Sequence, residues 1–131
     1  MPPRIRPFLM FQGAASEALE FYVSLFPKGV VDSVARYGPG EPGAEGSIKL
    51  ATFTLAGQTL MCIDSPVKHA FTFTPAFSLF VDCESEAELQ RLYSALLTEG
   101  AALMPLGNYG FSRQFGWVND RFGVSWQLNL P

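Results

Sequence analysis

The chain has 131 residues, of which 48% are hydrophobic and 16% charged, and this composition is typical of one globular domain rather than a multidomain protein. Lys and Arg total 9 and Asp and Glu total 12, so the net charge is −3, and no basic run is present to follow a nucleic-acid backbone. No run approaches the roughly 18 apolar residues of a membrane-spanning helix, and the N-terminal residues lack a signal peptide's apolar region. The sequence therefore argues against nucleic acid and membrane partners and predicts a cytoplasmic protein.

Aromatic side chains make up 14% of the chain, and twelve residues are Phe. Such a composition rules against disorder, because the apolar content is sufficient to form a packed core. The apolar surplus also suggests a ligand cavity or a subunit interface. We therefore expect a small-molecule ligand of unknown identity and a homodimer.

The first half of the chain shows the pattern of a strand, a helix and three further strands. Residues 5–11 form a short apolar run, and the helix that follows has an apolar stripe before Pro27 and Gly29. That stripe consists of Ala18, Leu19, Tyr22, Leu25 and Phe26. Residues 30–37, 47–55 and 58–63 read as strands. Residues 38–46 contain four Gly and two Pro, so they predict a loop.

The same pattern starts again in the second half. Residues 76–81 predict a strand, and the next segment predicts a helix with a second apolar stripe. That stripe consists of Leu89, Leu92, Tyr93, Leu96 and Leu97. Residues 101–106, 111–118 and 124–129 predict three more strands.

The two halves can be aligned as an internal repeat. Several residues match in order: Phe8 and Phe11 with Phe77 and Phe80, Tyr22 with Tyr93, and Gly29 with Gly100. Chance agreement among common helix-start residues is the alternative, but the order of elements agrees as well as the letters. A half of this size could not bury its apolar face alone. The sequence therefore predicts one α+β domain, residues 1–131, made of two βαβββ repeats (about 1–68 and 75–131) joined by a linker.

Three segments carry a resemblance to a known family: PFLMFQGAASEALEFYVSLFP, FSLFVDCESEAEL and NDRFGVSWQL. They resemble the PhnB-like branch of the vicinal oxygen chelate superfamily, which includes glyoxalase I, extradiol dioxygenases and the fosfomycin and bleomycin resistance proteins. The likeness covers nearly the whole chain, and its most specific part is Asp120 to Gln127. The resemblance implies two βαβββ modules that form a cupped eight-stranded mixed sheet with helices on the outer face, and usually a homodimer.

Proteins of this branch often bear the name demethylubiquinone methyltransferase. A methyltransferase of the dinucleotide-type fold would show a glycine fingerprint between a strand and a helix. No strand of this sequence is followed by G-x-G-x-x-G.

Enzymes of the superfamily generally hold a divalent metal with His and Glu from the first and last strands of each module. The corresponding positions here are Pro7, Ala76, Met61 and Gln127. Gln127 stands where relatives show Glu, and a neutral amide oxygen is a weaker ligand than a carboxylate. The resemblance therefore implies that the usual metal site is absent, and we expect no metal and no other cofactor.

Alternation along the last strands suggests which side chains could line a cup. Ser125, Gln127 and Asn129 alternate with apolar residues, and alternate residues of a strand face opposite sides of a sheet. An Arg in a cup could bind a carboxylate or phosphate, although Arg on a strand is usually solvated and aromatic residues usually belong to the core. The candidate ligand-binding residues are Gln127, Met61, Arg113, Trp117, Arg36 and Phe115.

His69 is the only histidine and lies between the two repeats. A general base or lone ligand is the functional interpretation, and an exposed linker residue is the favoured one, since no second metal-binding residue is suitably spaced. Cys62 and Cys83 lie in apolar strand-like runs. Both are expected to be buried reduced thiols rather than a disulfide.

The sequence leaves two main function classes open. One is a metal-independent protein that binds a small molecule in the cup. The other is an enzyme with an unconventional site, either a lyase, a dioxygenase or the methyltransferase of the branch's name. A dimer whose cup is filled by its own side chains is a third possibility.

Overall fold

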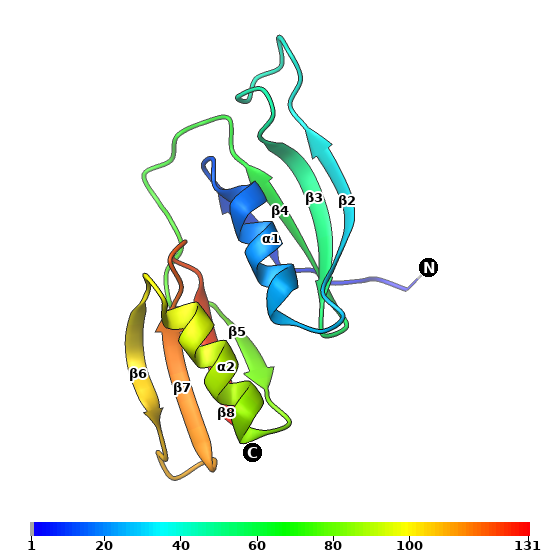
Figure 1. Ribbon diagram of the computed structural model, residues 1–131. Helices are drawn as coiled ribbons and strands as arrows, with labels where there is room; N and C mark the ends of the chain where they lie inside the picture. The colour runs from blue at the N-terminus through cyan, green and yellow to red at the C-terminus, as the bar shows by residue number, and fades with distance from the viewer. Residues whose placement is uncertain (1) are drawn as a thin grey trace. The chain divides into compact units, whose positions relative to one another are not determined.

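The computed structural model describes residues 2–131, which form two compact units divided between His69 and Ala70. Each unit has one helix and one four-stranded sheet (Figure 1). Within these residues no helix is long and apolar enough to cross a membrane.

The first unit contains one helix and four strands. They are β1 (Phe8–Phe11), α1 (Ala15–Leu25), β2 (Val30–Arg36), β3 (Ile48–Leu55) and β4 (Gln58–Asp64). The strand order is β1-β4-β3-β2, in which β1 pairs with β4 in parallel and the other pairs are antiparallel. The first and last strands of the unit are therefore neighbours in its sheet.

Helix α1 packs on one face of this sheet and buries its apolar stripe. Tyr22, which is 1% exposed, stacks on Phe53 of β3 with the ring centroids 6.4 Å apart. Since side chains alternate along a strand, Met61 and its cross-strand partners Phe8 and Thr52 lie on the opposite, open face.

The second unit repeats this plan. Its elements are β5 (Ser78–Asp82), α2 (Glu86–Leu97), β6 (Ala101–Gly107), β7 (Gln114–Asn119) and β8 (Ser125–Leu130). The strand order is β5-β8-β7-β6, with β5 parallel to β8 and the other pairs antiparallel. Ser85 is the N-cap of helix α2, and its side chain accepts a hydrogen bond from Glu88 N.

Close packing identifies the face of the second sheet that α2 covers. A Cβ atom placed on Gly116 would lie 2.8 Å from the ring of Tyr93, which is a residue of α2. Leu128 is the cross-strand partner of Gly116, and it is fully buried. Phe115 and Trp117 alternate with Gly116, so they lie on the open face of the sheet.

The predicted α+β class and the two βαβββ modules are confirmed, and each module contributes a mixed four-stranded sheet. The eight-stranded cup stays a prediction. Strand ends differ from expectation where the backbone cannot continue a ladder. Strand β1 begins at Phe8 rather than residue 5, because Pro7 has no N–H to donate. Strand β7 begins at Gln114 rather than residue 111, after bends that follow Gly110 (φ 97°).

The register refines the alignment of the repeats. Phe8 pairs with Met61 and Phe80 pairs with Gln127, so matching Met61 to Gln127 makes Phe80 the equivalent of Phe8. The sequence alignment had placed Phe77 there, but Phe77 precedes β5.

Candidate functional site

A hydrogen-bonded cluster of polar side chains lies on the open face of the second sheet. Gln127 Nε2 donates to Ser78 Oγ (3.2 Å), and Ser78 Oγ lies 2.7 Å from Ser125 Oγ. Trp117 Nε1 donates to Ser125 Oγ (2.8 Å). These four residues come from three adjacent strands, β5, β8 and β7, so the sheet itself fixes their spacing. We call them the Gln127 cluster.

Aromatic rings adjoin this cluster. Phe80 is paired with Gln127 across the sheet, and its ring centroid lies 6.2 Å from that of Phe115. Phe115 also contacts Phe111 (5.0 Å) and Tyr109 (6.3 Å) edge-to-face. Phe80 is 55% exposed and Phe111 is 61% exposed, whereas Phe115 is 4% exposed. We call Phe80, Tyr109, Phe111 and Phe115 the aromatic patch.

Three of the six candidate residues from the sequence come together on this open face, namely Gln127, Trp117 and Phe115. Gln127 and Trp117 are cross-strand partners and half-buried. Met61 lies elsewhere, on the open face of the first sheet, between Phe8 and Thr52. At this position the first sheet therefore presents the thioether of Met61, where the second sheet presents the amide of Gln127.

The two arginines make structural contacts. Arg36 donates from Nη1 to the carbonyl of Gly46 (2.9 Å) and from Nη2 to Ser16 Oγ (3.3 Å), so it ties the 38–46 loop to α1. Arg113 precedes β7 and donates from Nε to the carbonyl of Pro131 (2.7 Å). Neither guanidinium forms part of the Gln127 cluster.

Sequence reasoning missed Ser78 and Phe80 as candidates for the site. Both lie on β5, where they alternate with the half-buried Leu79 and Val81. That alternation is visible in the sequence, and it could have assigned Ser78 and Phe80 to the same face as Gln127.

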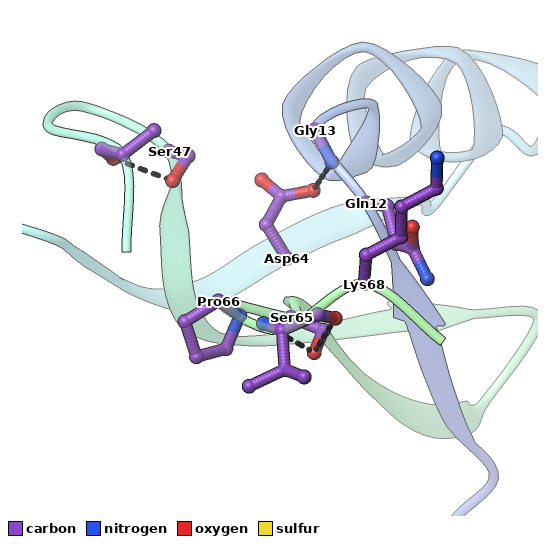
Figure 2. A pocket seen from close by; sticks show the side chains of 9 residues that line it. Gln12, Gly13, Ser47, Asp64, Ser65, Pro66 and Lys68 are labelled. Carbon is purple, nitrogen blue, oxygen red and sulfur yellow. Dashed lines mark hydrogen bonds between the residues drawn. The ribbon is translucent and has the colours of Figure 1, made fainter. Parts of the chain in front are cut away.

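A separate pocket of about 290 Å³ opens beside the start of α1 in the first unit, and Gln12, Asp64, Ser65 and Lys68 are among the residues that line it (Figure 2). Asp64 Oδ1 accepts hydrogen bonds from Gly13 N (2.7 Å) and Ala15 N (3.0 Å), and Oδ2 accepts one from Ile48 N (2.9 Å). Asp64 is 3% exposed, and its carboxylate joins the start of α1 to β3.

His69 follows this pocket. Its Nε2 lies 3.0 Å from Ser65 Oγ, and Ser65 Oγ also donates to the carbonyl of Val67 (2.9 Å). The histidine is thus part of a local turn. The interpretation of His69 as a general base or a lone ligand stays untested.

The metal-binding positions implied by the resemblance do not fit a divalent ion. Pro7 and Ala76 offer no side-chain ligand, and the carbonyl of Pro7 accepts a hydrogen bond from Met61 N (2.9 Å). Gln127 donates to Ser78. Within residues 2–131 no group of three or more His, Cys, Asp and Glu side chains is placed to hold a metal ion.

Comparison with known proteins agrees with this architecture. The family model of 3-demethylubiquinone-9 3-methyltransferase matches residues 3–129. Protein YjdN of Escherichia coli K12 is 25% identical over 96% of this chain and 94% of its own length.

Solved structures give the same result. A PhnB protein from Bacillus cereus is 55% identical with a TM-score of 0.96, covering 98% of this chain and 100% of its own. Protein PA1353 from Pseudomonas aeruginosa is 30% identical with a TM-score of 0.87, covering 98% of both chains. A glyoxylase/bleomycin resistance protein/dioxygenase domain from Frankia shares the fold, with 14% identity and a TM-score of 0.66, and the match covers 99% of this chain and 98% of its own. The chain belongs to the PhnB-like family named 3-demethylubiquinone-9 3-methyltransferase.

Proposed function

We propose that this protein binds a small molecule on the open face of its second sheet, without a resident metal ion. The observation that carries the proposal is the Gln127 cluster beside the exposed aromatic patch. Ligand sites in proteins typically combine apolar and aromatic surface with a few positioned polar groups. This face has both.

Exposure of the aromatic patch supports binding rather than a purely structural role. A single exposed aromatic residue is ordinary, but contiguous exposed apolar surface marks an interaction site. Phe80 and Phe111 both contact Phe115 while keeping more than half of their surface in water. A planar apolar molecule could cover them and reach Gln127.

A ligand screen by thermal shift tests this proposal, because a molecule that binds only the folded state raises its melting temperature. Hits should lose affinity about fivefold or more in Phe80→Ala, since an aromatic contact stabilises by about 1 kcal/mol. Phe8→Ala is the matched control, because Phe8 occupies the equivalent position of the first sheet and is 52% exposed. Equal losses in both variants would refute the assignment to the second sheet.

Elemental analysis tests the metal-independent part of the proposal. The dialysed protein should contain much less than one divalent ion per chain. A stoichiometric ion that survives dialysis would contradict it.

An enzyme is the second candidate function, and the family's name is the observation that favours it. A methyltransferase should bind a methyl donor such as S-adenosylmethionine, which calorimetry would detect. A lyase or dioxygenase would instead turn over a candidate substrate. Turnover that Gln127→Ala leaves unchanged would remove Gln127 from the reaction.

We also propose a homodimer. Several large apolar side chains are more than half exposed, including Phe8, Phe71, Phe77, Phe80 and Phe111. Such surface commonly marks a subunit interface or a ligand site. Light scattering at micromolar concentration should give twice the mass of one chain, and the mass of a single chain would contradict the proposal.

A cytoplasmic location is proposed on the state of the thiols. Cys62 and Cys83 are both free and buried, which suits a reducing compartment. Fractionation of source cells should recover the protein with cytoplasmic markers, and recovery from an oxidising compartment would overturn the proposal.

A further inference from the structure

On the open face of the second sheet, the amide nitrogens of Gln127 and Asn129 donate to neighbouring side chains, whereas their amide oxygens accept no hydrogen bond within residues 2–131. Gln127 is oriented by Ser78, because its Nε2 donates to Ser78 Oγ (3.2 Å). Ser78 is held in turn by Ser125, which is 1% exposed and also accepts from Trp117 Nε1. Within residues 2–131, Gln127 Oε1 accepts no hydrogen bond.

Two other amide side chains on this face, those of Asn129 and Asn119, also have an oxygen that accepts no hydrogen bond from any residue that the structure describes. Asn129 is 8% exposed, and its Nδ2 donates to Asp82 Oδ1 (3.0 Å), but its Oδ1 is buried without a partner in the part of the chain that the structure describes. Asn119 is the cross-strand partner of Ser125, and its Oδ1 is likewise buried and unsatisfied. A buried carbonyl oxygen without a donor destabilises the folded state. These two oxygens are fully buried, so Gln127 Oε1, which is not fully buried, is the acceptor that a ligand can reach.

The charge of Asp82 on this face also favours a ligand that is neutral or cationic over an anionic one. Asp82 follows Phe80 by two residues on β5, so its carboxylate lies on the same face and repels anionic ligands. Arg113 keeps its positive charge, but it precedes β7 and its Nε donates to the carbonyl of Pro131, outside the Gln127 cluster. The face therefore offers acceptor oxygens and a negative charge beside aromatic rings.

We infer that the ligand is a planar aromatic molecule, neutral or cationic, that donates a hydrogen bond from an O–H or N–H group to Gln127 Oε1. This inference rests on the proposed function and specifies the chemical class of its ligand. Ser78 is a positioning residue in this arrangement, since it holds the amide nitrogen of Gln127 and leaves the oxygen for the ligand.

Two probes that differ in one hydrogen-bond donor test the inference. 2-Naphthol carries a hydroxyl group, and 2-methoxynaphthalene has the same rings with the donor replaced by a methyl ether. Binding is followed by the indole N–H signals of ¹⁵N-labelled protein. Trp117 reports on the open face, and Trp126, whose Nε1 donates to the buried Asp120 (3.0 Å), is an internal control.

2-Naphthol should move the Trp117 signal, leave the Trp126 signal in place, and bind about fivefold or more tightly than its methyl ether. Equal binding of the two probes with movement of Trp117 would overturn the donor inference and leave the proposed binding face intact. Absence of any movement of Trp117 with either probe at millimolar concentration would overturn both.

Two variants separate positioning from folding. Ser78→Ala should reduce the preference for 2-naphthol over the ether to about twofold or less, because Gln127 is then free to turn its nitrogen outward, and Ser78→Thr should restore it. Ser33→Ala, an exposed serine of β2, is the matched control and should keep the full preference. Undiminished preference in a folded Ser78→Ala protein would remove the positioning role.

Discussion

At the scale of single residues, two buried carboxylates organise the two modules. Asp64 accepts three backbone N–H groups from the start of α1 and from β3. Asp120 accepts the N–H groups of Phe122 and Val124 and the indole N–H of Trp126. The segment from Asp120 to Gln127, which carries the most specific part of the family resemblance, is thus held together by hydrogen bonds to Asp120. These bonds fix the turn before β8 and with it the position of the Gln127 cluster.

Replacing either carboxylate should strongly destabilise the protein. Asp64→Ala leaves three buried N–H groups without an acceptor, and we expect a loss of about 3 kcal/mol or more in the free energy of unfolding. Urea denaturation measures the loss. Asp32→Ala is the control, because Asp32 is exposed and accepts from Thr54 Oγ1 (2.7 Å), and it should change stability by less than about 1 kcal/mol. A similar small change in Asp64→Ala would disprove its organising role.

The buried thiols predict unreactive cysteines and a loss of stability in alkali. Burial, with a smaller contribution from the Asp64 carboxylate, raises the pKa of Cys62 to about 12. Burial, assisted by Glu88, raises the pKa of Cys83 to about 11. At pH 8 iodoacetamide should therefore label both thiols only after unfolding, because the thiolate is the reactive form.

The pH dependence follows from the direction of these shifts. Above the ordinary thiol pKa of 9.0, the unfolded chain releases protons that the folded chain retains. Folding stability contributed by the neutral thiols should therefore fall as the pH rises from about 9 to about 11 for Cys83 and to about 12 for Cys62. Urea midpoints measured across this range should fall less in a Cys62→Ala, Cys83→Ala double variant. An equal fall in that variant would assign the effect to other groups.

At the scale of helices and strands, sequence periodicity predicted the identity and order of every element, because each buried face leaves a clear pattern. The ends of strands were harder to predict, since Pro7 and the bends after Gly110 act through backbone geometry. The site was predicted in part. Alternation identified Gln127 and Trp117, and the same alternation along β5 could have placed Ser78 on this face. Its hydrogen bond to Ser125, 47 residues away in the chain, is not visible in any local pattern.

The glycines that follow the two helices, Gly29 and Gly100, show what the repeat preserves. A Cβ atom on Gly29 would lie 2.2 Å from the carbonyl oxygen of Val23, and one on Gly100 would lie 2.2 Å from that of Asn119. Only a residue without a side chain allows such approaches. Both modules thus require a glycine after the helix, although the nearest carbonyl belongs to α1 for Gly29 and to β7 for Gly100.

Alanine at these glycines should disrupt packing. We expect Gly29→Ala and Gly100→Ala each to lower the free energy of unfolding by about 2 kcal/mol or more, because backbone atoms must move. Gly107→Ala is the control, since its Cβ would meet ordinary contacts at 3.7 Å, and it should be nearly neutral. Equal free energies of unfolding for all three variants, measured by denaturation, would refute this explanation.

At the scale of the whole molecule, we propose that the two repeats fold as one domain. Each unit buries one face of its sheet under its helix and leaves apolar side chains on the other, including Phe8 in the first unit and Phe80 in the second. Units of this size have small cores and are marginal alone. The halves should therefore depend on each other.

Separate expression of residues 1–68 and 75–131 tests this dependence. Neither fragment alone should show a cooperative thermal transition, whereas the whole chain should unfold in one step. Two independent transitions in the whole chain would show that the repeats are separate domains.

The parallel pairing of the first and last strands also governs when each module can fold during synthesis. Strand β1 has no partner until β4 has left the ribosome, and β5 must wait for β8, the central neighbour of β5 and β7. Such distant pairing slows folding and leaves strand edges and apolar side chains open to aggregation. A ribosome that pauses before residue 125 therefore holds a second module in which no strand joins β5 to the β6–β7 hairpin, and synonymous codons just upstream should influence the yield of soluble protein.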